Sequence, residues 1–200
     1  MSDAPQLERA LAAIDAANAD DPDTIVIAGQ ERPKEHAHAE LMSDWVRRLD
    51  PEATDAQLLA ARAHHLRRWT IPRSSYPEGR AGYLRWRTTL KKQHAREVAE
   101  ILEREGYEPA VIERVQQIVR KDGLGHDAAV QTHEDALCLV FLQTQLLELA
   151  AEQGEEKTIE IVRKTTAKMS ARGIAAASAL ELTPEARALV ERAMTATEKP

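Results

Sequence analysis

Hydrophobic residues recur along most of the chain at intervals of three and four, the spacing that places side chains on one face of an α-helix. Leu7, Leu11 and Ile14 form the first such face. Further helices are expected over residues 33–49, 54–69, 80–105, 109–121, 132–152, 155–170 and 183–197. The pattern therefore predicts an all-α fold, in the form of a helical bundle.

The segments between these helices are short and polar. Residues 20–32 form a connector in which only Thr24–Ile27 resembles a strand, and it is too short to build a sheet. Residues 71–79 contain two prolines and a glycine, so we expect an ordered connector there and not a helix. The helix over 132–152 is the most apolar, so it is expected at the centre of the core. No repeat or flexible linker interrupts the chain, and we predict one domain over residues 1–200.

The composition is that of a soluble protein, with 43% hydrophobic and 30% charged residues. The single cysteine, Cys138, rules out an intramolecular disulfide and a multi-cysteine zinc site. No apolar stretch approaches the roughly 18 residues that cross a bilayer. Residues 1–7 have neither the basic region nor the apolar core of a secretion signal. We therefore expect a cytoplasmic protein without a membrane partner, and its oligomeric state stays open.

The charge is unevenly distributed. The net charge is −6, yet the segment from Arg62 to Arg96 contains ten Arg and Lys residues and one acid, Glu78, for a local charge of +9. The remainder of the chain is at −15. That acidic remainder would repel a long polyanion, which argues against nucleic acid in spite of the interleaved Arg and Trp residues. An anionic small molecule is the partner that this distribution favours.

Histidine and carboxylate residues lie on the inward faces of four predicted helices. Together they predict a site for a divalent transition metal, Fe, Mn, Co, Ni or Zn, because imidazole and carboxylate are ligands of these ions. Glu134 and Asp135 are the candidate catalytic carboxylates. The alternative is structural, since a single inward histidine is more often a hydrogen-bonded core residue. The predicted metal ligands are Glu35, His38, His64, His65, His94 and Asp135, whereas His36, His126 and His133 are expected on the surface.

Basic and aromatic side chains accompany this set, in part along one face of the helix over 80–105. A guanidinium group matches the geometry of phosphate and carboxylate oxygens, and aromatic rings can form the wall of a pocket. The alternative is a solvated face whose aliphatic stems cover the core. The predicted anion-binding and substrate-binding residues are Arg68, Trp69, Arg73, Tyr76, Arg80, Tyr83, Arg87, Lys91 and Lys168.

Residues 60–68, AARAHHLRR, resemble the motif of the HD-domain superfamily of metal-dependent phosphohydrolases, in which adjacent His and Asp ligands end an apolar helix. In that register His64 matches the His, and His65 stands where the superfamily has Asp. His38 resembles the upstream His, and Asp135 the last Asp. The resemblance implies an HD-like core over about 33–150, with C-terminal helices over 155–197 against it. Because His replaces the signature Asp, the phosphohydrolase mechanism does not transfer directly.

A second resemblance covers nearly the whole chain. It is carried by PKE (33–35), HLRRWTIPRSSYP (65–77), GYLRWR (82–87), KKQHA (91–95), HEDALCLVFL (133–142) and KMS (168–170). These segments are similar to a bacterial and fungal family of unknown function, sometimes labelled glutamyl-tRNA synthetase. The resemblance favours Glu35, His65, His94 and Asp135 over His38 and His64. The synthetase label does not fit, because the chain lacks the pattern of a doubly wound nucleotide-binding sheet.

Three classes of function are compatible with these residues. The first is a metal-dependent enzyme, a hydrolase acting on a phosphorylated or otherwise anionic small molecule such as a nucleotide. An HD-type di-iron oxygenase is a variant of it. The second is a non-enzymatic module that binds an anion or nucleotide without metal. The third is a helical interaction protein whose basic segment meets acidic surfaces.

Overall fold

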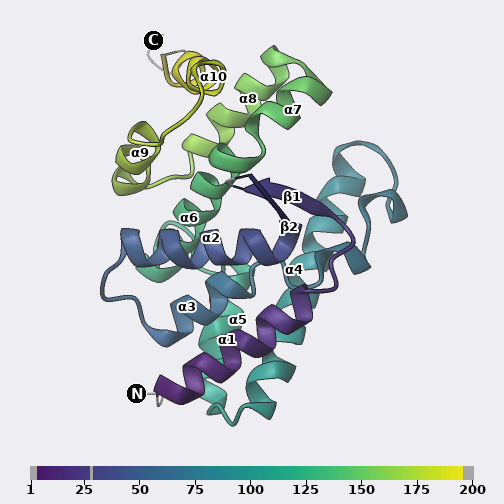
Figure 1. The fold of residues 1–200 in the computed structure, drawn as a ribbon, viewed down its shortest axis with the longest axis vertical. Coiled ribbons are helices and arrows are strands. Elements are labelled where there is room, and N and C mark those ends of the chain that lie inside the picture. Colours follow the sequence, from purple (N-terminus) through teal and green to yellow (C-terminus); the bar gives the residue numbers. More distant parts are fainter. Residues whose placement is uncertain (1–3, 28, 196–200) are drawn as a thin grey trace. The chain divides into compact units, whose positions relative to one another are not determined.

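The computed structural model describes residues 4–27 and 29–195, and these residues are predominantly helical (Figure 1). The all-α fold class is therefore confirmed. The chain divides into two compact units, Met1–Gly123 and Leu124–Pro200. The predicted core over 33–150 includes parts of both units, so its boundaries and the single domain stay predictions.

The first unit comprises five α-helices, a two-stranded hairpin and two short 3₁₀ turns in its described part, drawn from purple to teal in Figure 1. In chain order they are α1 (Ala4–Asn18), β1 (Thr24–Ile27), β2 (Gln30–Pro33), α2 (Lys34–Leu49), α3 (Asp55–Arg62), η1 (Arg68–Thr70), η2 (Arg73–Ser75), α4 (Gly79–Arg104) and α5 (Pro109–Arg120).

The hairpin differs from the sequence prediction. Thr24–Ile27 does pair, antiparallel with Gln30–Pro33, in a register that joins Thr24 to Pro33 and Ile27 to Gln30. Gly29 in the turn has a φ of 78°, which glycine adopts without a steric penalty. The second strand, Gln-Glu-Arg-Pro, has no alternation of apolar residues, so nothing in its pattern predicts a strand.

Helix α3 starts as predicted and ends earlier. Thr54 caps its first turn, and the side chain of Gln57 returns to the Thr54 backbone N–H, which completes a capping box. The helix ends at Arg62, whereas the apolar pattern predicts it to Trp69. The chain instead turns, with Arg67 in the left-handed region at a φ of 50° and its N–H donating to Asn18 Oδ1 at 3.0 Å.

The connector over 71–79 is ordered, as predicted, because it is fastened to α4. Trp86 Nε1 donates to the carbonyl of Ile71 at 2.8 Å. The Arg73 guanidinium donates to the carbonyls of Tyr76 and Pro77. A Cβ at position 82 would lie 1.8 Å from the Pro77 oxygen, so Gly82 is what allows the connector to lie directly on the helix.

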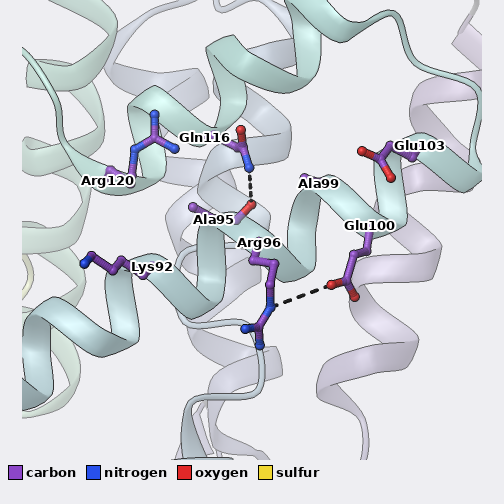
Figure 2. Close-up of a pocket in the computed structure, with 8 residues that line it drawn as sticks. All are labelled: Lys92, Ala95, Arg96, Ala99, Glu100, Glu103, Gln116 and Arg120. Atoms are coloured by element: carbon purple, nitrogen blue, oxygen red, sulfur yellow. Dashed lines mark hydrogen bonds and ion pairs between the residues drawn. The ribbon is translucent and has the colours of Figure 1, made fainter.

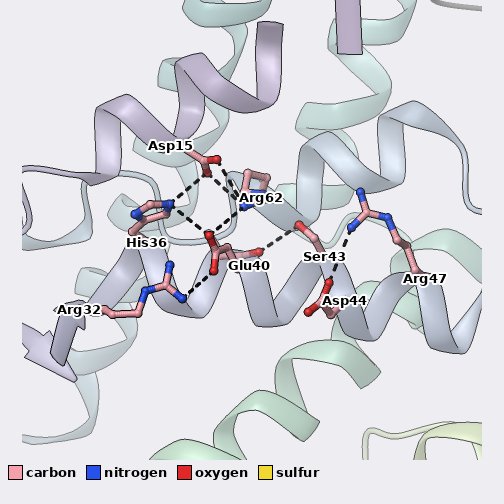
Figure 3. A network of polar contacts seen from close by, with 9 residues as sticks. Asp15, Arg32, His36, Glu40, Ser43, Asp44, Arg47 and Arg62 are labelled. Carbon is pink, nitrogen blue, oxygen red and sulfur yellow. Dashed lines mark hydrogen bonds and ion pairs between the residues drawn. The ribbon is translucent and has the colours of Figure 1, made fainter. Parts of the chain in front are cut away.

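Helices α1, α2 and α3 share a network of polar contacts centred on Arg62 (Figure 3). Arg62 Nη1 lies 3.3 Å from Asp15 Oδ1 and 4.0 Å from Glu40 Oε1. His36 Nε2 lies 3.8 Å from Asp15 and 3.5 Å from Glu40. The His36 side chain is 24% exposed and thus partly buried, whereas the sequence predicts it on the surface. The network fixes the end of α3, where the chain turns toward His65.

The second unit consists of α6 (Ala128–Thr144), α7 (Leu146–Gln153), α8 (Glu155–Thr166), α9 (Ala171–Ser178) and α10 (Pro184–Thr195), drawn in green to yellow in Figure 1. The helix predicted over 132–152 begins earlier, where the Asp127 side chain accepts from the N–H groups of Ala129 and Val130. It is interrupted at Gln145. Its residues Leu139 and Leu142 are fully buried, as a core helix requires.

The second unit differs from the sequence prediction at His133 and at α9. His133, predicted on the surface, is 1% exposed within α6. Helix α9 is not predicted, because its sequence ARGIAAAS lacks the large apolar residues that mark a helical face. Residues 196 and 197, the end of the helix predicted over 183–197, lie outside the described residues.

Among the residues that the structure describes, no helix combines the length and the hydrophobicity that crossing a membrane requires.

Candidate metal centre

The start of α2 is shaped by a residue that sequence reasoning missed. Pro33 at the N-cap makes no side-chain cap bond, and Asp21 takes that role from a distance. Asp21 Oδ2 accepts from the Glu35 N–H at 2.8 Å, and Oδ1 accepts from Asp23 N–H at 3.0 Å. Burial raises the pKa of Asp21, and these two backbone donors oppose that shift. Asp21 therefore positions Glu35; its only signal in the sequence is the acidic segment DDPD that precedes the helix.

Glu35, His38 and His65 form a compact cluster. Each offers a ligand atom that lies within 4.8 Å of the other two. Glu35 Oε2 lies 2.9 Å from His65 Nδ1 and 3.6 Å from His38 Nδ1. Ligand atoms about 2.1 Å from a tetrahedral ion stand about 3.4 Å apart, so these two separations bracket what such an ion needs.

The cluster combines an ionised carboxylate, that of Glu35, with the neutral imidazole of His65. Burial would raise the pKa of Glu35, but His65, His38 and the Arg68 guanidinium hold it well below its usual value. Burial lowers the pKa of His65 to about 4, against the opposing effect of the Glu35 charge. Since an ionised carboxylate can only accept, His65 Nδ1–H donates to Glu35. A metal ion bound at Nδ1 would require this proton to move to Nε2, which keeps the ring neutral, whereas the Glu35 carboxylate is already ionised as coordination requires.

His94 on α4 presents a lone pair next to this cluster. Its Nδ1–H donates to the Leu66 carbonyl at 2.8 Å, which leaves Nε2 as the acceptor nitrogen. Among the described residues Nε2 has no hydrogen-bond partner, although the side chain is 3% exposed. Burial lowers the pKa of His94 to about 3, so the ring is neutral. The ring centroid lies 6.0 Å from that of His65, which makes Nε2 a candidate further ligand.

His64 also lies beside the cluster. It is buried, and its ring centroid is 4.1 Å from that of His65. His64 is not part of the group whose ligand atoms lie within 4.8 Å of one another. Among the described residues that group consists of Glu35, His38 and His65.

Glu134 and Asp135 lie on α6 in the second unit, where each has a partner of its own. Lys168 Nζ donates to Glu134 Oε1 at 2.8 Å. Asp135 Oδ1 accepts from Ser170 N–H at 2.9 Å and from Gln131 Nε2 at 3.0 Å, while Oδ2 accepts from the Ser170 hydroxyl. These bonds hold the turn between α8 and α9 against α6. The predicted roles of Glu134 and Asp135 in catalysis and of Asp135 as a metal ligand stay predictions.

The predicted anion-binding residues are in varied environments. Arg68 contacts the cluster, with Nη1 at 3.5 Å from Glu35 Oε1. Arg73 is engaged with the connector carbonyls, and the Arg87 guanidinium lies over the Tyr83 ring at 5.7 Å. The remaining members range from partly buried to exposed: Trp69, Tyr76, Arg80, Lys91 and Lys168.

A groove between α4 and α5 contains none of the predicted site residues. Figure 2 shows basic side chains toward one end of it and acidic side chains toward the other. Gln116 Nε2 spans the two helices by donating to the Ala95 carbonyl. The lining residues are Lys92, Ala95, Arg96, Ala99, Glu100, Glu103, Gln116 and Arg120.

Comparison with known proteins assigns the family. A model described as a domain of unknown function, DUF4202, matches residues 8–190. The chain belongs to the DUF4202 family. No functionally curated protein and no solved structure gives a significant match. Membership in DUF4202 agrees with the resemblance to a family of unknown function, whereas the resemblance to HD-domain phosphohydrolases stays a prediction.

The metal-free DUF4202 protein is expected to lose stability as the pH falls. In the unfolded chain histidines take up protons near 6.5, whereas in the folded state His65 and His94 take them up only near about 4 and about 3. Protons therefore favour the unfolded state below 6.5, and the lowered pKa of Glu35 acts in the same direction. The free energy of unfolding should fall by an amount on the order of a few kcal/mol between neutral pH and about pH 4.

Urea unfolding in the presence of a chelator, followed by circular dichroism, measures this dependence. The variant His94→Phe removes one of these two histidines. Its free energy of unfolding should therefore fall less steeply than that of the wild type as the pH decreases below 6.5. A midpoint that stays constant from about pH 7 to about pH 5 would contradict the lowered pKa values.

Proposed function

We propose that this protein is a metal-dependent hydrolase of a phosphorylated or otherwise anionic small molecule, nucleotide-like in character. The observation that carries the proposal is the grouping of Glu35, His38 and His65 within 4.8 Å. Buried ionisable residues that converge in this way are uncommon without a role, because each costs desolvation free energy.

The residues around the cluster fit this chemistry. A divalent metal bound there would lower the pKa of a water molecule and polarise the substrate. Glu35 and the two imidazoles supply one negative charge and two neutral donors, which leaves the site with a net positive charge when it is loaded. Arg68 adds a further positive charge at the edge of the cluster, so an anionic substrate is favoured.

Hydrolysis can be tested directly. We would strip the purified protein with a chelator and reload it separately with Mn²⁺, Fe²⁺, Co²⁺, Ni²⁺ or Zn²⁺. Release of inorganic phosphate would then be followed from p-nitrophenyl phosphate and from nucleoside mono-, di- and triphosphates. At least one metal should restore activity, and His65→Ala should abolish it.

The matched control is His126→Ala, which removes an exposed histidine from the second unit. Its activity should equal that of the wild type. Absence of hydrolysis with every metal, or activity that survives chelation and His65→Ala, would refute the proposal.

A second candidate is the metal-free binding module. It is favoured by the fact that Glu35 already has polar partners in His65 and Arg68 without an ion. In that case phosphate or a nucleotide should bind equally well before and after chelation. Equilibrium dialysis with and without the chelator separates the two functions.

A further inference from the structure

Arg68 lies between two different partners. Its Nη1 is 3.5 Å from Glu35 Oε1, and its guanidinium lies over the Trp86 ring at 5.1 Å from the centroid. The Arg68 side chain is 30% exposed, whereas that of Glu35 is 6% exposed. The guanidinium therefore lies at the boundary between the buried cluster and solvent.

The Trp86 contact does not depend on Glu35. Trp86 Nε1 donates to the Ile71 carbonyl at 2.8 Å, and its ring is buried at 7% exposure. Gly82, one turn earlier, allows the connector to lie directly on α4. A cation over a tryptophan face is attracted to it whether or not a carboxylate is also present. Trp86 can therefore keep Arg68 beside the cluster when the contact with Glu35 is lost.

A divalent ion and Arg68 compete for the same carboxylate. Both are cations, and the carboxylate between them is only 6% exposed, so their repulsion is stronger than it would be in solution. The two histidines face Glu35 Oε2, whereas Arg68 contacts Oε1. An ion at Oε2 would draw negative charge away from the carboxylate and repel the guanidinium, which weakens the contact of Arg68 with Oε1. Two cations next to each other at a partly exposed edge form a site for an oxyanion, whose oxygens can contact the metal and the guanidinium together.

We propose that Arg68 exchanges partners, from Glu35 in the metal-free protein to an oxyanion such as a phosphate group in the metal-loaded protein. This inference rests on the metal site of the proposed function and deepens it. Its consequence is that metal and oxyanion bind cooperatively, each raising the affinity for the other by the same factor.

The test is a calorimetric titration of the stripped wild-type protein with Co²⁺, with and without inorganic phosphate at matched ionic strength. Phosphate should tighten Co²⁺ binding about tenfold, a typical coupling between two sites. Phosphate itself binds Co²⁺ weakly in solution and lowers the free ion, so that side reaction works against the expected result. Phosphate is kept below the solubility limit of its cobalt salt.

The variant Arg68→Gln separates the two roles of the guanidinium. Without phosphate it should bind Co²⁺ several-fold more tightly than the wild type, because the competing cation is gone. Phosphate should then tighten Co²⁺ binding much less than it does in the wild type, because only its contact with the metal remains. Arg68→Lys keeps the charge without the planar fork and should retain part of the coupling. The matched control is Arg85→Gln, an exposed position on α4, which should behave as the wild type does.

The outcomes distinguish this inference from the proposed function. If the wild type binds no Co²⁺, both are overturned. If Co²⁺ binds with the same affinity with and without phosphate, the exchange of Arg68 is overturned and the metal site stands. Coupling that is as large in Arg68→Gln as in the wild type, or Co²⁺ binding that weakens in this variant, also overturns the exchange.

Discussion

Replacing His65 with alanine is expected to remove the bound metal from the purified protein. His65 is the residue that joins the two elements of the cluster, since its Nδ1 lies 2.9 Å from Glu35 Oε2 across a separation of 30 residues. Loss of a metal's second-shell partner alone typically lowers affinity tenfold to about a hundredfold, so the loss of a ligand should cost on the order of a hundredfold or more. Elemental analysis after dialysis measures the metal content per chain.

Two further variants define the ligand set. Glu35→Gln keeps the size of the side chain and removes its charge, and it should lose metal to a similar extent. His94→Ala removes Nε2, which has no hydrogen-bond partner in the part of the chain that the structure describes, and should lower the metal affinity about tenfold, as expected if this nitrogen contributes to the site. His126→Ala is the control and should keep full occupancy. Full metal occupancy in His65→Ala would refute the site.

The all-α class could be predicted because helical periodicity is a local property of the sequence. The deviations occur where tertiary contacts override that pattern. The apolar stripe predicts α3 to Trp69, but the chain leaves the helix at Arg62, and Leu66 is buried in the turn that follows. That turn needs Arg67 in a left-handed conformation, supported by Asn18 from α1. Nothing in the local sequence indicates such a distant partner.

Only part of the candidate site could be predicted from the sequence. Glu35 and His38 share a helical face at a spacing of three, so their proximity follows from the sequence. That His65 joins them depends on how α3 lies against α2, which periodicity does not determine. Resemblance to a family favoured Glu35 and His65, and it ranked His38 lower than the structure does. Asp21 escaped prediction because it acts on the Glu35 backbone N–H and not on a side chain.

Asp135 is expected to matter for stability rather than for metal content. Its carboxylate accepts from Ser170 N–H, the Ser170 hydroxyl and Gln131 Nε2, and it is 2% exposed. A Cβ at position 173 would lie 2.6 Å from Asp135 Cγ, so the carboxylate also touches the first turn of α9. Asp135→Ala removes the acceptor of the half-buried Ser170 N–H and hydroxyl, whereas Gln131 Nε2 keeps the Lys168 carbonyl as an acceptor. The free energy of unfolding should fall by about 3 kcal/mol, because hydrogen bonds to a charged group are lost.

Urea unfolding, together with hydrogen exchange of α9, measures this loss, and elemental analysis of the same sample measures the metal. Ser170→Ala is the matched control: it removes one donor to Asp135 and the cap on Gly173 N–H, and should cost about 1 kcal/mol. The sequence-based assignment of Asp135 as a ligand predicts the opposite pattern. Loss of metal from Asp135→Ala with an unchanged unfolding midpoint would establish that assignment. A residue whose main role is to hold α9 against α6 cannot be removed without lowering the stability of the second unit.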